Sequence, residues 1–208
     1  MAITGSVEKA AESTESVQPP VSSKYVPTTP LPDTLVTTYL QMTDWTQFRP
    51  AYLNYLDRIK VMCMEAPDVA FYRFLYGSIG KQWRWRERIS HSNEEIKALL
   101  VEPGTSVHVL YVDGAPAGYI ELAQHQEGSS ARFYSTEIVY FGLRPGYTGQ
   151  GLGKHLLSHG IAYAWNKGTQ RLWVHTCNLD APNTLKNYIN RGFKVYRVDE
   201  QAMPECYI

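Results

Sequence analysis

The sequence predicts a mixed α/β domain, and three observations support this fold class. Hydrophobic residues make up 44% of the 208 residues and aromatic residues 12%, which is enough apolar material for a core. Two runs with a period of two flank Asp113-Gly114, a strong signal for a β-hairpin. Nearer the C-terminus, a strand, a glycine-rich turn, a helix and a further strand follow one another as a single crossover.

Residues 1–33 differ from the rest of the chain in composition. They are rich in Pro, Ser and Thr and contain few large apolar side chains. Such a segment cannot bury enough surface to offset the entropy lost on ordering. Its acidic residues and its lack of arginine argue against a mitochondrial transit peptide. We therefore expect a disordered tail over 1–33 and one domain over 34–208.

Local patterns assign the elements of this domain in chain order. Apolar residues recur at helical spacing over 48–64 and 68–79, and Ser92-x-x-Glu95 is a capping box that opens a short helix through Leu100. Further helices are predicted over 151–165, ended by Lys167-Gly168, and over 182–190. Runs that alternate or are rich in β-branched residues predict strands at 34–40, 107–112, 117–123, 133–143, 171–177 and 193–198.

Charge and cysteine content exclude several classes of protein. The formal net charge is zero, with 20 basic and 20 acidic residues, so no overall field attracts nucleic acid or an acidic membrane. The cysteines Cys63, Cys177 and Cys206 form no CxxC pair, so we expect neither a disulfide framework nor a metal site. No apolar run approaches the roughly 20 residues that span a bilayer. We expect a cytoplasmic protein with no metal and with neither nucleic acid nor membrane as a partner.

The glycine turn from Thr148 to Lys154 lies between a strand and a helix, where backbone N–H groups and the positive helix end converge. This arrangement favours an anion site, although a glycine-rich connection without a ligand is an alternative. A P-loop would need Gly at 148 and Ser or Thr at 155, but the sequence has Thr148 and His155. A dinucleotide fingerprint would need more βα units than the roughly 55 following residues provide.

Two blocks of sequence around this turn carry a more specific signal. The first reads Glu137-Ile-Val-Tyr-Phe-Gly-Leu-Arg-Pro-Gly-Tyr-Thr-Gly-Gln-Gly-Leu-Gly-Lys-His-Leu-Leu, and the second reads Asn187-Tyr-Ile-Asn-Arg-Gly-Phe. Together they resemble the GNAT superfamily of acetyl-CoA-dependent N-acetyltransferases, over roughly residues 34–200. The resemblance implies a GNAT fold, in which a central, mixed, mostly antiparallel twisted sheet is flanked by helices and a splayed strand pair binds acetyl-CoA.

The resemblance also assigns residues to acetyl-CoA, the expected co-substrate. The family pattern has Arg or Gln where this chain has Thr148, but backbone N–H groups form most of the phosphate cradle, so we expect binding to survive. The seventh strand common in the family is expected to be short or absent, and a second copy in a homodimer could complete that edge. The expected acetyl-CoA contacts are Phe141, Gly142, Leu143, Gly149, Gln150, Gly151, Leu152, Gly153, Lys154 and Asn183.

Acetyl transfer to an amine needs a base for the amine and a proton for the leaving thiolate. Glu137 lies in an apolar strand where an ionised carboxylate is costly to bury, and it matches the glutamate base of the histone-acetyltransferase branch of the family. His175 is the rival base because imidazole titrates near neutrality. Tyr188 corresponds to the family tyrosine that protonates the thiolate, with helix packing as the alternative. Cys177 is set aside as an acyl carrier, since the family generally transfers directly.

The predicted acceptor-binding residues are Arg73, Trp83, Trp85 and His175. In the family fold, the segment containing the first three forms one wall of the acceptor cleft. In an extended chain, Trp83 and Trp85 would share one flat apolar face and Arg84 and Arg86 the other, which favours a small amine carrying an anionic group. A small-molecule amine is therefore the leading acceptor. A protein lysine or N-terminus is an alternative acceptor, and an acyl-CoA-binding module without turnover is an alternative function.

Overall fold

The computed structural model describes residues 30–54, 57–127 and 133–207, and it confirms the predicted mixed α/β class. Within these residues, seven strands form one sheet in the order β2-β3-β4-β5-β6-β1-β7. Every neighbouring pair is antiparallel except β5 and β6. The strands are β1 (Thr34–Met42), β2 (Ile59–Cys63), β3 (Thr105–Val112), β4 (Ala115–Gln126), β5 (Tyr134–Leu143), β6 (Arg171–Cys177) and β7 (Lys194–Ala202).

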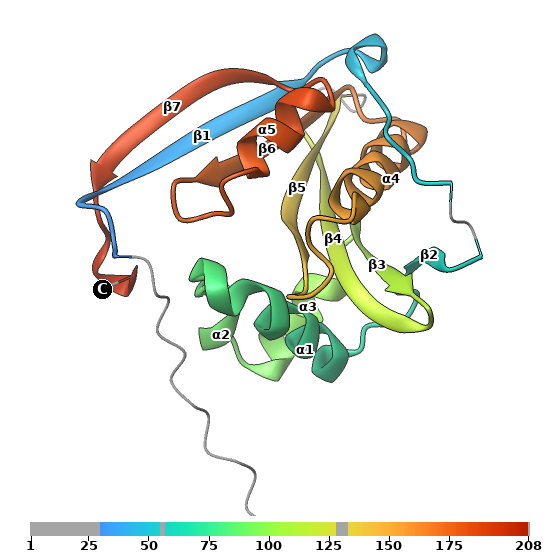
Figure 1. Ribbon diagram of the computed structural model, residues 1–208, viewed down its shortest axis with the longest axis horizontal. Coiled ribbons are helices and arrows are strands. Elements are labelled where there is room, and N and C mark those ends of the chain that lie inside the picture. The colour runs from blue at the N-terminus through green and yellow to red at the C-terminus, as the bar shows by residue number, and fades with distance from the viewer. Residues whose placement is uncertain (1–29, 55–56, 128–132, 208) are drawn as a thin grey trace, which may run out of the picture.

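Helices cover both faces of the sheet. In Figure 1, α1, α2 and α3 gather on one side, while α4 and α5 lie on the other. Each side has its own apolar cluster, one with Tyr72 and Ile96 and the other with Leu156 and Tyr188. In the part of the chain that is described, no helix is both long and apolar enough to cross a membrane. The helices are α1 (Val69–Gly80), α2 (Glu87–Ser90), α3 (Asn93–Val101), α4 (Leu152–Asn166) and α5 (Thr184–Asn190).

Local sequence signals account for most of these elements. Asp68 caps α1 by accepting the Phe71 N–H at 2.8 Å, and the predicted Ser92–Glu95 capping box opens α3. Asp113 and Gly114 both have positive φ, as a two-residue hairpin turn between β3 and β4 requires.

The helix predicted over 48–64 is wrong. Residues 48–54 form neither helix nor strand. Side chains of α4 satisfy two of their backbone donors, because the Ala51 N–H donates to Ser158 Oγ at 2.9 Å and the Leu53 N–H donates to His155 Nδ1 at 3.1 Å. Two residues of the predicted helical pattern, 55 and 56, lie outside the described residues.

The same stretch ends in strand β2. Along it, half-buried positions such as Ile59 and Val61 alternate with the exposed Lys60 and Met62. This period of two is a strand signal that the helical interpretation overlooked. Antiparallel pairing of β2 with β3 then supplies the backbone hydrogen bonds that a helix would have supplied locally.

The first strand takes an unexpected place in the sheet. β1 lies between β6 and β7 and pairs antiparallel with both (Figure 1). β7 has nine residues and extends beyond the predicted end at 198. The expectation of a short or absent seventh strand is therefore wrong, because this chain has a full β7 and its own β1 completes the edge of β6.

The parallel pair β5–β6 is joined over a short length only. Its register runs from Ser135 opposite Arg171 to Ile138 opposite Val174. Directly after this point, Glu121 of β4 faces Tyr140 whereas Leu122 faces Ile138, so Val139 is an extra residue in β5. Such a β-bulge bends its strand and increases its twist. β5 continues alongside β4 and separates from β6, which confirms the predicted splayed pair.

Replacing Leu40 with Ala tests the placement of β1. Leu40 is fully buried, so Leu40→Ala should lower the free energy of unfolding by about 2–5 kcal/mol. Chemical denaturation measures this change. Deletion of residues 1–29 is the control. This variant should keep wild-type stability, because the deleted segment contains few large apolar side chains. Wild-type stability of Leu40→Ala would contradict a position of β1 inside the sheet.

Candidate active site

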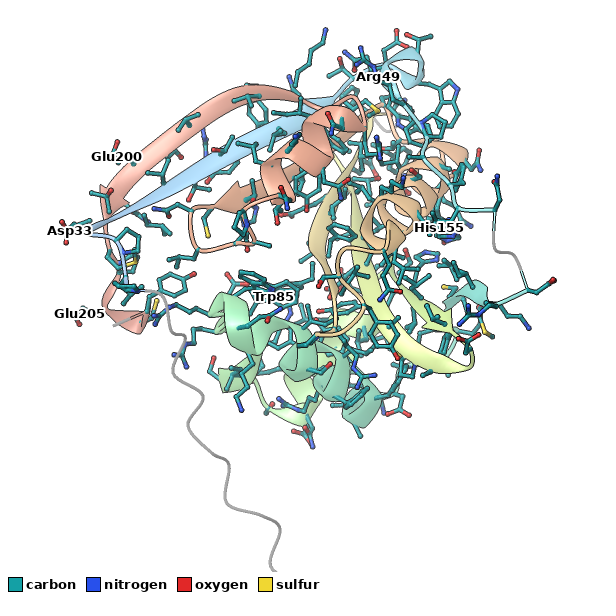
Figure 2. All side chains as sticks on the ribbon, in the orientation of Figure 1. Asp33, Arg49, Trp85, His155, Glu200 and Glu205 are labelled. Atoms are coloured by element: carbon teal, nitrogen blue, oxygen red, sulfur yellow. The ribbon has the colours of Figure 1, made fainter. Side chains whose placement is uncertain are left out.

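A cavity of about 790 Å³ opens where β5 and β6 separate. One wall comes from residues 137–143 of β5, and the opposite wall comes from residues 174–191, which include the end of β6 and all of α5. The glycine turn before α4 and the segment 83–87 after α1 line it as well. Figure 2 shows Trp85 of this segment on the side of the helical layer that faces β6. The cavity thus joins elements that are distant in sequence.

The glycine turn presents backbone donors to one part of this cavity. Gly149 and Gly151 have φ values of +77° and +78°, a region that favours glycine. Gly151 is the N-cap of α4, so the N–H groups of the first helical turn have no partners inside the helix. These donors and the helix dipole favour an anion such as a pyrophosphate.

The structure brings most of the predicted acetyl-CoA contacts to the cavity and leaves two side chains outside it. Gln150 instead donates from Nε2 to the Gly146 carbonyl at 2.8 Å, and Leu152 is buried in the core. These two residues can contribute only backbone groups. Thr148, where the family pattern has Arg or Gln, also lines the cavity. The predicted contacts that line it are Phe141, Gly142, Leu143, Gly149, Gly151, Gly153, Lys154 and Asn183.

Sequence reasoning missed two cations of the cavity, Lys186 and Arg191. Both belong to the α5 region, where single charges in a short helix look like ordinary surface residues. The Nε atom of Arg191 is buried and has no hydrogen-bond partner, and burial lowers the pKa of this guanidinium. With Lys154, these residues place three cations on the α4 and α5 side of the cavity, and they fit a co-substrate carrying phosphates.

Glu137 and His175, which the sequence offers as rival bases, form one pair. Glu137 lies opposite Trp173 in the ladder, and His175 follows two residues later, so both side chains project from the same face. His175 Nδ1 is 3.5 Å from Glu137 Oε1. The hydrogen bond to Glu137 raises the pKa of His175, and this effect outweighs the opposing effect of burial.

Tyr188 lies on the α5 side of the same cavity and is nearly fully buried. Its ring packs between Phe141 and Phe193, with centroid distances of 6.1 and 5.7 Å. Burial raises the pKa of Tyr188 far above its usual range, and the charge of Asp180 adds to this. The phenol therefore stays protonated at neutral pH.

Cys177 also lines the cavity, at the end of β6. Burial, with a smaller contribution from Asp180, raises the pKa of this thiol to about 11. A protonated thiol is a poor nucleophile. The local environment thus argues against an acyl-cysteine intermediate.

Trp83 and Trp85 line the cavity, but not in the extended conformation that the sequence analysis expected. Lys81–Trp83 is a 3-10 helix, and Arg84 is left-handed with a φ of 59°. The Trp85 ring packs against Tyr76 and Tyr140, with centroid distances of 5.3 and 5.0 Å. The predicted alternation of an aromatic face and a guanidinium face is therefore absent from this segment.

Arg73 does not line the cavity, which corrects the predicted acceptor contact. Its Nε donates to Asn93 Oδ1 at 2.8 Å, and a terminal nitrogen donates to the His91 carbonyl. These bonds tie α1 to the loop between α2 and α3. The guanidinium has a structural role that the sequence pattern did not show.

A buried polar network, also missed from the sequence, fixes the wall that carries Trp85. The Glu121 carboxylate accepts from the Tyr72 hydroxyl at 2.6 Å and from an Arg88 terminal nitrogen at 3.3 Å. The Tyr140 hydroxyl donates to the Glu87 carboxylate. Because α2 has only four residues, the bonds of Arg88 to Glu121 of β4 and of Glu87 to Tyr140 of β5 hold it in place.

Comparisons with known proteins agree with this fold. The model of the acetyltransferase (GNAT) family matches residues 71–193. An aminoglycoside acetyltransferase from an uncultured soil metagenomic sample, in complex with trehalose, is similar with a TM-score of 0.56 and 16% identity, over 65% of this chain and 88% of that chain. No curated protein sequence gives a significant match.

Two further solved structures share the fold. A GCN5-related N-acetyltransferase from Kribbella flavida has a TM-score of 0.56 and 12% identity, over 81% of this chain and 58% of that chain. An acetyltransferase from Trypanosoma brucei has a TM-score of 0.52 and 18% identity, over 70% of this chain and 97% of that chain.

The fold and the family match define an acyltransferase class of protein. The chain belongs to the acetyltransferase (GNAT) family, because the family model covers more than half of it. The resemblance stated from the sequence is confirmed, and membership of this family implies that acetyl-CoA is used.

If Glu137 and His175 form a pair, a single substitution of Glu137 should change the pKa of His175. Because the carboxylate raises the pKa of His175, Glu137→Gln should lower it. The pair therefore stabilises the folded protein at pH values below the usual pKa of histidine. This stabilisation is lost as the pH rises through the raised pKa of His175. NMR of labelled histidines measures the shift, with His159, whose pKa burial lowers, as the unchanged control. An unaltered His175 titration would contradict the pairing.

Two matched glycines test the anion site. Gly149 and Gly168 have φ values of +77° and +82°, and a Cβ at either meets nothing within 4 Å. They lie before and after α4, and only Gly149 lines the cavity. Gly149→Asp should sharply weaken acetyl-CoA binding, measured by calorimetry, because it adds negative charge beside the phosphates. Gly168→Asp should bind like wild type, and equal affinities for the two variants would refute the site.

Proposed function

We propose that this chain is an N-acetyltransferase that moves the acetyl group of acetyl-CoA to a primary amine of a small molecule. One observation carries the proposal. The Glu137–His175 pair and Tyr188 line the same cavity as the glycine turn of α4. A base, an acid and an anion-binding helix start are the groups that this transfer needs.

Glu137 acts as the general base in this mechanism. An alkyl amine is mostly protonated near neutral pH and attacks only after it loses a proton. Glu137 is mostly buried, with 17% of its side chain exposed, and it lies 3.5 Å from the imidazole of His175. His175 therefore holds the carboxylate in position at the floor of the cavity.

The transfer itself balances without a metal or a covalent enzyme intermediate. The amine nitrogen attacks the thioester carbonyl carbon, the C–N bond forms, and the C–S bond breaks. Before the attack, the ammonium gives one proton to Glu137, which passes it to water. After the attack, the nitrogen gives its second proton to Glu137, and the leaving thiolate takes a proton from the hydroxyl of Tyr188. The products are an acetamide and coenzyme A, and exchange with water restores both side chains.

One comparison supports a small acceptor. One similar structure is described as an aminoglycoside acetyltransferase, and this name indicates a small amine as its acceptor. A panel of small amines, amino acids and lysine peptides, with coenzyme A release as the readout, tests this class. Acetylation of peptides alone would overturn the small-acceptor proposal.

Glu137→Gln should lower kcat by about 10²- to 10⁴-fold, the usual contribution of a positioned base. The acid limb of the pH–rate profile should vanish when the Glu137 carboxylate is removed, while the Kd for acetyl-CoA should stay unchanged. If His175 were the base instead, the limb would persist and move to lower pH, because loss of the carboxylate lowers the pKa of His175. That result would refute the assignment of Glu137.

Tyr188→Phe removes the hydroxyl and keeps the ring that packs between Phe141 and Phe193. We expect a fall in kcat of about 10²-fold or more with an unchanged melting temperature. Tyr163→Phe is a control, since Tyr163 does not line this cavity. An equally active Tyr188→Phe enzyme would reduce Tyr188 to a packing residue.

A further inference from the structure

The segment that follows β7 returns to the cavity. The Met203 N–H donates to the Asp33 carbonyl at 3.0 Å, so the chain leaves the sheet beside the start of β1. Glu205–Tyr207 then forms a short 3-10 helix. Figure 1 shows this end of the chain below the β1–β7 edge, toward the level of α2. Tyr207 lines the cavity, whereas Glu205 points away from it (Figure 2).

This short helix is tied to the opposite wall of the cavity. A terminal nitrogen of Arg84 donates to the Tyr207 carbonyl at 3.2 Å. The left-handed conformation of Arg84 directs the chain from the 3-10 helix Lys81–Trp83 into the aromatic wall at Trp85. This hydrogen bond links the segment after β7 to the segment after α1, and both segments line the cavity.

Tyr207 lines the same cavity as Glu137, the proposed base, and His175. Burial raises the pKa of Tyr207 to about 12, and Cys177 of β6 and Glu87 of α2 are among the groups that add to the rise. Glu87 also contributes to the raised pKa of His175. Glu87, Cys177 and Tyr207 line the cavity together with the Glu137–His175 pair, so Tyr207 borders the same space as the proposed base.

We propose that Tyr207 is a specificity-determining residue whose ring closes the acceptor end of the cavity and restricts the acceptor to compact amines. The inference rests on the proposed function and deepens it. An acceptor that extends past the ring, such as a lysine within a peptide, would have to displace the 3-10 helix and break its bond to Arg84. The ring also excludes water from the thioester.

Exclusion of water gives the proposal a direct kinetic consequence. A water molecule that reaches the thioester attacks the same carbonyl carbon, the C–S bond breaks, and acetate and coenzyme A are released. An open acceptor end should therefore increase the release of coenzyme A in the absence of any amine. It should also weaken the discrimination between compact and extended acceptors.

Three variants distinguish the effect of the Tyr207 ring from effects of the rest of the 3-10 helix. Tyr207→Ala should raise acceptor-independent coenzyme A release several-fold, raise the KM for a compact amine, and increase the relative rate with a lysine peptide. Tyr207→Phe keeps the ring and should behave like wild type. Glu205→Ala alters the same 3-10 helix on its outward side and should also behave like wild type. The Kd for acetyl-CoA should not change in any variant.

Alkylation of Cys177 provides a readout that does not depend on turnover. Cys177 lines the same cavity as Tyr207, and Cys63 lies on β2 as an internal reference. Peptide mass spectrometry after iodoacetamide treatment should show several-fold faster labelling of Cys177 in Tyr207→Ala alone. Equal labelling and equal KM in all variants would overturn the inference while leaving the transferase intact. Faster labelling in a chain that transfers no acetyl group would refute the proposed function instead.

Discussion

The β-bulge at Val139 is the constraint on which the rest of the site depends. Up to Ile138, β5 pairs with both β4 and β6. The extra residue then turns the strand, and pairing with β6 ends while pairing with β4 continues to Leu143. A sheet that stayed fully paired would leave no gap between its central strands. The cavity of about 790 Å³ is therefore a consequence of one irregular residue in a regular ladder.

The bulge is important because the connection between β5 and β6 places the N-terminus of α4 beside the gap. A parallel pair requires a crossover, and α4 provides it, so the N-terminus of α4 faces the point where the strands part. Glu137 and His175 lie close to the last paired residues, so their geometry is set by the ladder. The glycine turn and the Glu137–His175 pair are thus held by the same two strands and line the same opening.

The sequence predicted what local chemistry determines. Glycines at positive φ, the capping box at Ser92 and the motif around Tyr188 each depend on neighbours within a few residues. Arg191, Tyr207 and the Arg88–Glu121 pair could not be found in this way, since their partners come from distant elements. The period of two in β2 indicates a strand, but a helical pattern over 48–64 overlapped it and was preferred. The insertion of β1 beside β6 depends on tertiary pairing, which no local pattern encodes.

The central claim is that acetyl-CoA occupies the gap between β5 and β6 with its phosphates at the start of α4. Hydrogen exchange of the full chain, followed by mass spectrometry with and without acetyl-CoA, tests it most directly. The account predicts slower exchange at residues 149–154 and at 139–143, where the backbone of β5 faces the gap, with little change in β2 and β3. Unchanged exchange at both segments, or protection confined to other parts of the sheet, would contradict it.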